Sequence, residues 1–102
     1  MFSNYTSLDL SKFMEVFSLE FGFEERYSRF NVNMVGSGFL DFSNKDYNLK
    51  LTFQNGSELG EFIRFFLHGD KSLPEVGLII KSKIIVDGHS TIIKIDDLLE
   101  EL

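Results

Sequence analysis

YNLKLTFQNGSELGEFIRFFLHG, residues 47–69, contains a strand pattern followed directly by a helix pattern. From Tyr47 to Gln54 apolar and polar residues alternate, which is the period of a strand with one buried face. After the Asn55-Gly56 turn pair, the apolar residues take the spacing of one helical face: Leu59, Phe62, Ile63 and Phe66. Ser57 is the predicted N-cap of this helix and Gly69 its stop. The stretch therefore predicts a strand and a helix that pack on each other.

The residues before this stretch predict one helix and two further strands. The helix has apolar residues on one face and ends at Gly22, where a left-handed cap is expected: Leu10, Phe13, Met14, Phe17 and Phe21. Alternating runs over 29–34 and 40–42 predict the strands. Short Gly-rich or Asn-Lys-Asp connections favour an antiparallel meander of three strands.

The residues after the stretch predict a hairpin. GLIIKSKIIV (77–86) and HSTIIKI (89–95) flank Asp87-Gly88, a pair that readily forms a type I′ turn. DDLLEEL (96–102) predicts a short helix that begins with acidic residues. The predicted order is α-β-β-β-α-β-β-short α, an α+β fold. We expect a two-layer domain with a mainly antiparallel sheet of about five strands and helices packed on one side. A chain of 102 residues usually forms one core, so residues 1–102 are expected to form a single compact domain.

Composition excludes several classes of function. The chain has no Cys, so it has neither disulfides, nor thiolate metal sites, nor a Cys nucleophile. No spacing typical of a metal site, phosphate loop or catalytic triad is present, so we expect no cofactor and no enzymatic activity. Neither a secretory signal nor an apolar run long enough to cross a bilayer is found, and a cytoplasmic location follows as the expectation. The net charge of −6 disfavours direct binding of nucleic acid.

The predicted hairpin has an unusual outer face. It carries isoleucines interleaved with lysines on what would be the solvent side: Ile79, Lys81, Lys83, Ile85, Ile92 and Lys94. Lys81 would lie directly opposite Lys94, an unfavourable pairing of like charges. One interpretation is that lysine stems or the first helix cover the isoleucines. The other is a contact surface for an acidic partner or for a second copy of the chain, which Ile85→Glu would disrupt.

Acidic residues gather at the end of the first predicted helix and at the C-terminus. Glu20, Glu24 and Glu25 form the first group. Such a surface would attract a basic protein, for example one that handles nucleic acid, although a solvated face explains it equally. Phe65 lies roughly 110° from the centre of its helix's apolar face and is either an exposed anchor or packed beneath the following loop.

The leading hypothesis is a small acidic protein-interaction module without catalytic activity. Ala and Trp are absent while Phe, Ile, Lys and Asn are plentiful, a bias typical of AT-rich bacterial and phage genomes. The concrete version is thus a phage or mobile-element inhibitor that occludes a bacterial host protein, such as an anti-defence factor. The alternatives are an immunity protein that neutralises a toxin nuclease, and a small-ligand binder or enzyme with a site around Asp87, His89 and Tyr27. Nucleic-acid binding through Lys81, Lys83 and Lys94 ranks last.

Overall fold

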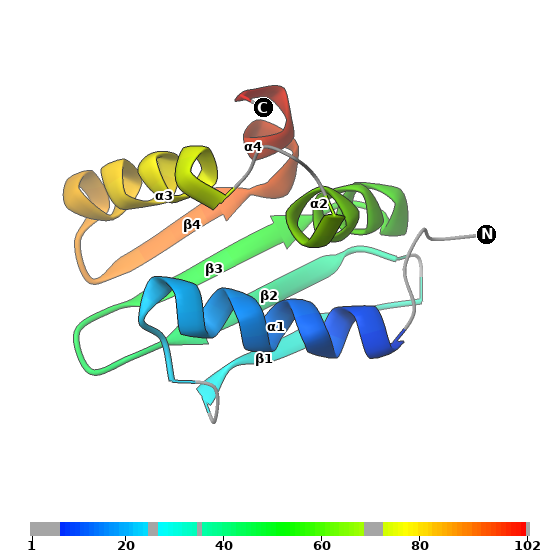
Figure 1. The fold of residues 1–102 in the computed structure, drawn as a ribbon, viewed down its shortest axis with the longest axis horizontal. Helices are drawn as coiled ribbons and strands as arrows, with labels where there is room; N and C mark the ends of the chain where they lie inside the picture. Colours follow the sequence, from blue (N-terminus) through cyan, green and yellow to red (C-terminus); the bar gives the residue numbers. More distant parts are fainter. Residues whose placement is uncertain (1–6, 25–26, 35, 69–72, 102) are drawn as a thin grey trace.

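The computed structural model describes residues 7–24, 27–34, 36–68 and 73–101. Within these ranges the structure contains both helices and strands, arranged as shown in Figure 1, and the fold is α+β. The elements, in chain order, are α1 (Ser7–Phe21), β1 (Arg29–Val32), β2 (Gly38–Ser43), β3 (Asn48–Phe53), α2 (Gly56–His68), α3 (Leu73–Asp87), β4 (Ser90–Lys94) and α4 (Ile95–Glu101).

The sheet has four described strands in the order β1-β2-β3-β4. The predicted meander is confirmed, because β1 pairs antiparallel with β2 and β2 pairs antiparallel with β3. The prediction of about five mainly antiparallel strands is wrong. Residues 78–86 belong to α3, and β4 lies parallel to β3, with Ile93 beside Leu51. The sheet is mixed because α2 and α3 together form the long crossover that parallel strands require.

Local chemistry explains the ends of the first two helices. Gly22 follows α1 with a φ of 76°, the left-handed conformation expected of a helix stop. The N-cap of α2 is Asn55 and not Ser57: its Oδ1 accepts a hydrogen bond from the backbone N–H of Glu58 at 2.9 Å. The Asn55 side chain also donates to the Glu58 carboxylate at 3.2 Å. The first bond satisfies a backbone N–H at the helix end and the second holds the Asn55 side chain in place, so the helix begins two residues earlier than a cap at Ser57 predicts.

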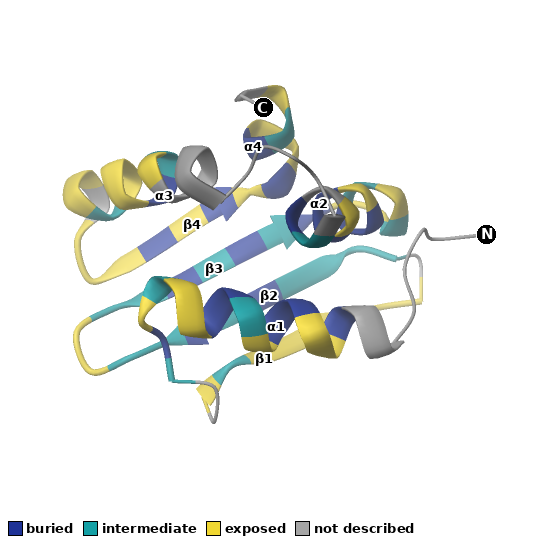
Figure 2. Ribbon diagram, viewed as in Figure 1, coloured by how far each residue is buried: buried dark blue, intermediate teal, exposed yellow. Residues whose placement is uncertain are grey.

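The core lies between the sheet and the helices in front of it (Figures 1 and 2). Much of it is aromatic: the ring centroid of Phe17 in α1 lies 4.4 Å from that of Phe42 in β2 and 5.4 Å from that of Phe66 in α2. Leu49 and Leu51 of the alternating stretch are fully buried, as their pattern predicts. In Figure 1, α1 and α2 cross in front of the sheet, while α3 runs alongside β4 at one edge. The two-layer arrangement with all helices on one side stays a prediction.

Candidate protein-binding surface

Helix α3 forms where the sequence predicted the first strand of a hairpin. Pro74 is the second residue of the helix, in the first turn, where a missing N–H costs no hydrogen bond. Gly88 ends it with a φ of 82° and donates its backbone N–H to the carbonyl oxygen of Ile84 at 2.8 Å. The positive φ that a type I′ turn needs at Gly88 also serves a helix C-cap, so Asp87-Gly88 fits either structure. Lys81 consequently does not face Lys94, whose strand neighbour is Thr52.

Helix α3 is apolar on two opposite faces. Its inner face holds Ile80, which is fully buried. Its outer face holds Leu78, Ile85 and Val86, which are 68%, 83% and 81% exposed. These three residues, at positions i, i+7 and i+8 of one helical side, are here called the α3 stripe. The solvent-facing side of a helix is normally polar, so the stripe is a surface that gains free energy when another molecule covers it.

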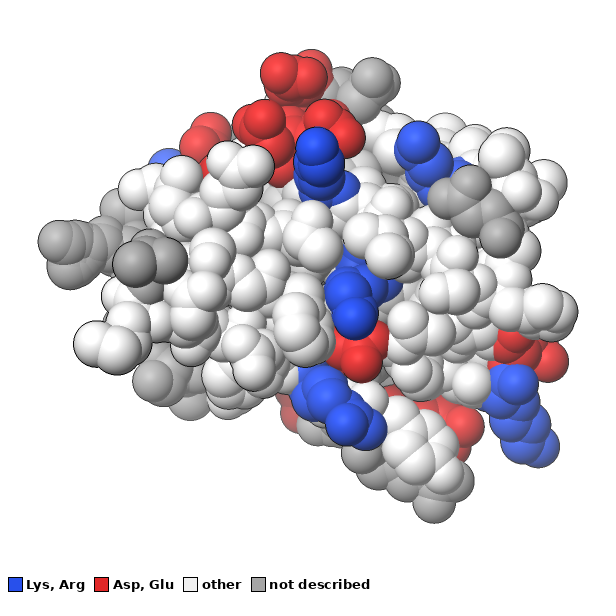
Figure 3. Space-filling view, turned by 180° about the vertical axis from the view of Figure 1, so that it is seen from behind, with Lys and Arg blue, Asp and Glu red and all other residues white. Residues whose placement is uncertain are grey.

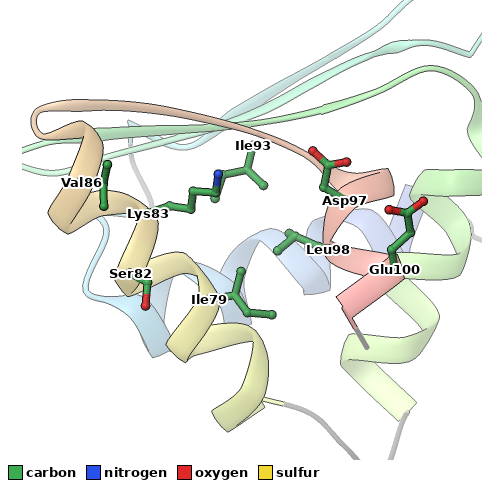
Figure 4. A pocket seen from close by; sticks show the side chains of 8 residues that line it. All are labelled: Ile79, Ser82, Lys83, Val86, Ile93, Asp97, Leu98 and Glu100. Carbon is green, nitrogen blue, oxygen red and sulfur yellow. The ribbon is translucent and has the colours of Figure 1, made fainter.

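A hollow of about 570 Å³ adjoins the α3 stripe and is lined by residues of α3, β4 and α4. This α3–α4 groove is lined by Ile79, Ser82, Lys83, Val86, Ile93, Asp97, Leu98 and Glu100 (Figure 4). In Figure 4 the side chains of Ile79 and Leu98 point toward each other from the two helices. Val86 belongs to both features, so the stripe and the groove adjoin each other.

Charged groups of both signs stand at the rim of the groove. Lys83 extends from α3, and the carboxylates of Asp97 and Glu100 lie on the α4 side (Figure 4). Asp96 adds a further exposed carboxylate to α4. All four side chains are exposed, so their charges are solvated and available to a partner. The α4 side of the groove is therefore acidic, and the α3 side carries a single cation in the lining.

The other two residues of the predicted hairpin face lie elsewhere. Ile92 and Lys94 are exposed on β4, on the side of the sheet opposite the buried Thr91 and Ile93. Figure 3 views the molecule from this side, here called the helix-free face, and basic side chains follow it from top to bottom. Strand register places Lys50 beside Ile92. The structure thus brings Ile79, Lys83 and Ile85 together on one helix but separates them from Ile92 and Lys94.

The helix-free face has the chemistry of a solvated surface with satisfied polar groups. The Nζ of Lys50 lies 4.5 Å from the centroid of the Phe39 ring, a cation–π contact. The side-chain amide of Asn48 donates to the carboxylate of Asp41 at 2.5 Å and to the Ser43 hydroxyl at 2.9 Å. These contacts engage the polar groups of Lys50, Asn48 and Asp41 within the protein.

The acidic residues predicted near the first helix are only partly placed. Glu20 is exposed near the end of α1, and Glu24 follows the helix half-buried. Glu25 lies outside the described residues. The backbone of Phe65 belongs to α2, but its side chain lies outside what the structure describes. Lys81 is exposed on α3.

The structure separates two residues of the alternative site around Asp87, His89 and Tyr27. His89 precedes β4 and Tyr27 precedes β1, and these strands are the opposite edges of the sheet. The Nδ1 of His89 lies 2.9 Å from the carbonyl oxygen of Asp46, and the His89 carbonyl accepts from the Asn48 N–H at 2.8 Å. His89 thus tethers the start of β4 to the β2–β3 turn. The side chain of Asp87 lies outside the described residues.

Neither a metal-ion site nor a membrane-spanning helix is found in the described ranges. No group of three or more His, Asp or Glu side chains in those ranges converges on a point where a metal ion would bind. None of the helices in those ranges combines the length and apolar character needed to cross a bilayer.

The chain matches no protein-family model, no curated protein and no solved structure at a significant level. Its function is therefore argued from the surface alone.

Proposed function

We propose that the protein is a non-enzymatic protein-binding module whose binding surface is the α3 stripe together with the α3–α4 groove. The observation that carries this proposal is the exposure of Leu78, Ile85 and Val86 on a helix whose inner face is already buried. The fully buried centre of a protein interface is more apolar than the rest of the protein surface and is depleted in charged residues. The groove beside them is the place for an apolar anchor residue of the partner.

The charges of the rim define the chemistry of the partner. Asp97 and Glu100 on the α4 side favour a segment that carries Lys or Arg next to its apolar anchor. The net charge of −6 acts in the same direction at longer range and speeds association with a basic protein. The proposed partner is thus a basic protein that presents an apolar segment, such as an amphipathic helix.

The specific version of the proposal is inhibition by occlusion in the bacterial cytoplasm. A phage or mobile-element protein that covers a basic, nucleic-acid-handling host protein would need no catalytic group, only this kind of surface. An immunity protein against a toxin nuclease would use the same physics. The gene neighbourhood separates the two, because a toxin gene directly upstream indicates the immunity protein.

The experiment compares two matched substitutions. Ile85→Glu places a carboxylate in the α3 stripe, whereas Ile92→Glu makes the same change at an exposed isoleucine on the helix-free face. The tagged wild-type chain, used as bait in a bacterial lysate, is expected to retain a stoichiometric basic partner. Ile85→Glu is expected to lose that partner and Ile92→Glu to keep it, with both variants folded by circular dichroism.

Two results would overturn the proposal. One is capture of the same partner by Ile85→Glu as by the wild-type chain. The other is the absence of any stoichiometric partner together with measurable turnover of a small substrate. Loss of the partner with Ile92→Glu alone would move the binding surface to the helix-free face and refute the assignment to α3.

A further inference from the structure

The two edges of the sheet are protected to different degrees. At one edge, α3 runs alongside β4 and contacts it (Figure 1). At the other, β1 pairs only with β2 among the described strands. Alternate residues of such an edge strand point their N–H and C=O groups away from the sheet, where another strand can bind them. β1 has four residues and Arg29 is its only charged side chain, so it lacks the lysines that usually discourage pairing.

Apolar side chains of β1 lie exposed on the side of the sheet that the helices cover. Phe30 pairs with the buried Leu40 and therefore points to that side, yet it is 51% exposed. Val32, two residues on, has the same orientation and is 38% exposed. Met34 follows and is fully exposed. Of the nine large exposed hydrophobic residues described, these three belong to this one short segment.

The cover provided by α1 ends before it reaches this edge. A hollow of about 400 Å³ lies between α1 and β1, and its lining is Ser11, Met14, Ser28, Arg29 and Phe30. The edge therefore combines unpaired backbone groups, exposed apolar side chains and unfilled space on the same side of the sheet. A strand added beside β1 would meet all three at once.

We propose that β1 is the interface of a homodimer, in which the β1 strands of two copies pair antiparallel about a two-fold axis at Asn31. In this register Phe30 of one copy lies opposite Val32 of the second copy, and the reverse. Aromatic–β-branched pairs of this kind stabilise antiparallel sheets. The interface is self-complementary, as a two-fold axis requires.

Two further features favour this register. Arg29 lies opposite Asn33 of the second copy, so no like charges face each other across the pair. Met34 of the second copy approaches Ser28, which lines the hollow, so the fully exposed methionine gains a place to bury. A shift by one residue would set Phe30 opposite Asn31, and the two copies would then carry their apolar residues on opposite faces of the sheet.

This surface is distinct from the α3 stripe, and the dimer does not depend on the function proposed above. The absence of Cys from the chain gives a direct test. Asn31 is exposed, and directly opposite residues of antiparallel strands have Cα atoms about 4.5–5.5 Å apart, which a disulfide can span. Asn31→Cys is therefore expected to form a covalent dimer under mild oxidation, seen on a non-reducing gel. Ser90→Cys, on the other edge strand, and Ile85→Cys, in the α3 stripe, are the matched controls and are expected to form no covalent dimer on the gel.

Sedimentation of the unmodified chain provides the second measurement. A dimer is expected, and Val32→Lys is expected to abolish it with the circular dichroism spectrum unchanged, because a charge would enter the apolar side of the pair. A monomer over the whole micromolar range would overturn the proposal. So would a dimer that Asn31→Cys does not cross-link, or one that Ile85→Cys or Ser90→Cys cross-links as well as Asn31→Cys does.

Discussion

Thr91 offers a test of the packing of β4 in which a substitution should stabilise the protein. Its side chain is fully buried, and its Oγ1 has no hydrogen-bond partner among the described residues. Its neighbour in the register, Leu49, is also fully buried, so the hydroxyl faces an apolar environment. A buried hydroxyl without a partner costs about 1–3 kcal/mol. Valine has nearly the same shape and is equally suited to a strand, so Thr91→Val removes this cost without opening a cavity.

The expected result is an increase of about 1–3 kcal/mol in the free energy of unfolding, out of the ~5–15 kcal/mol typical of a domain. Urea unfolding followed by circular dichroism measures it, as a higher midpoint with an unchanged slope. Thr52→Val is the control, because Thr52 is half-buried on the helix-free face and should change stability by no more than about 0.5 kcal/mol. A loss of stability in Thr91→Val would show that the hydroxyl is hydrogen-bonded and would refute the reasoning.

Two further predictions concern the helices. Phe17→Ala is expected to destabilise the fold by about 3–5 kcal/mol, because it removes a fully buried ring. Leu19→Ala, on the exposed side of α1, should change the free energy of unfolding by no more than about 0.5 kcal/mol. Urea unfolding compares the two variants, and equal losses would contradict the orientation of α1. Val86→Gln should likewise stay within about 0.5 kcal/mol, because Val86 is exposed on α3. A loss above about 2 kcal/mol would instead place Val86 in the core, as the hairpin interpretation required.

Residues 47–66 were predictable because their pattern is strong within a short window. Leu49, Leu51 and Phe53 are buried at alternate positions, and Phe62 and Phe66 are buried on one helical side. Each pattern has one period and one buried face, so the local sequence determines the element type. The three-strand meander followed from these patterns together with short connections.

Residues 78–86 were not predictable in the same way, because their apolar residues suit both periods. Ile80 is buried and Ile85 exposed in a strand as well as in the helix, so these two positions do not distinguish the structures. Whether residues 78–86 form a strand or a helix depends on β4. This strand pairs parallel with β3 and therefore requires a long crossover, which the local sequence pattern does not predict. Ser82 and Val86 do distinguish them, because both are exposed in α3. In the predicted hairpin they alternate with the outer-face residues Lys81, Lys83 and Ile85, and so would lie on the buried face. Because residues 77–86 were predicted to be a strand, the α3–α4 groove was not predicted. Only its α4 side was, as a short helix that begins with acidic residues.

The fold does not explain why the residues of the α3 stripe are apolar. α3 is anchored on its inner face by Ile80, and the stripe stands on the outer face, so replacing its members with lysine or glutamate would leave the core unchanged. Ile85 and Val86 are β-branched, which lowers helix propensity relative to Lys or Glu by a few tenths of a kcal/mol each. Without a partner the stripe therefore weakens the helix and exposes apolar surface to water. A protein that covers the stripe removes the exposed apolar surface, although the small propensity cost stays, which is why the binding proposal rests on this helix and not on the acidic charge of the chain as a whole.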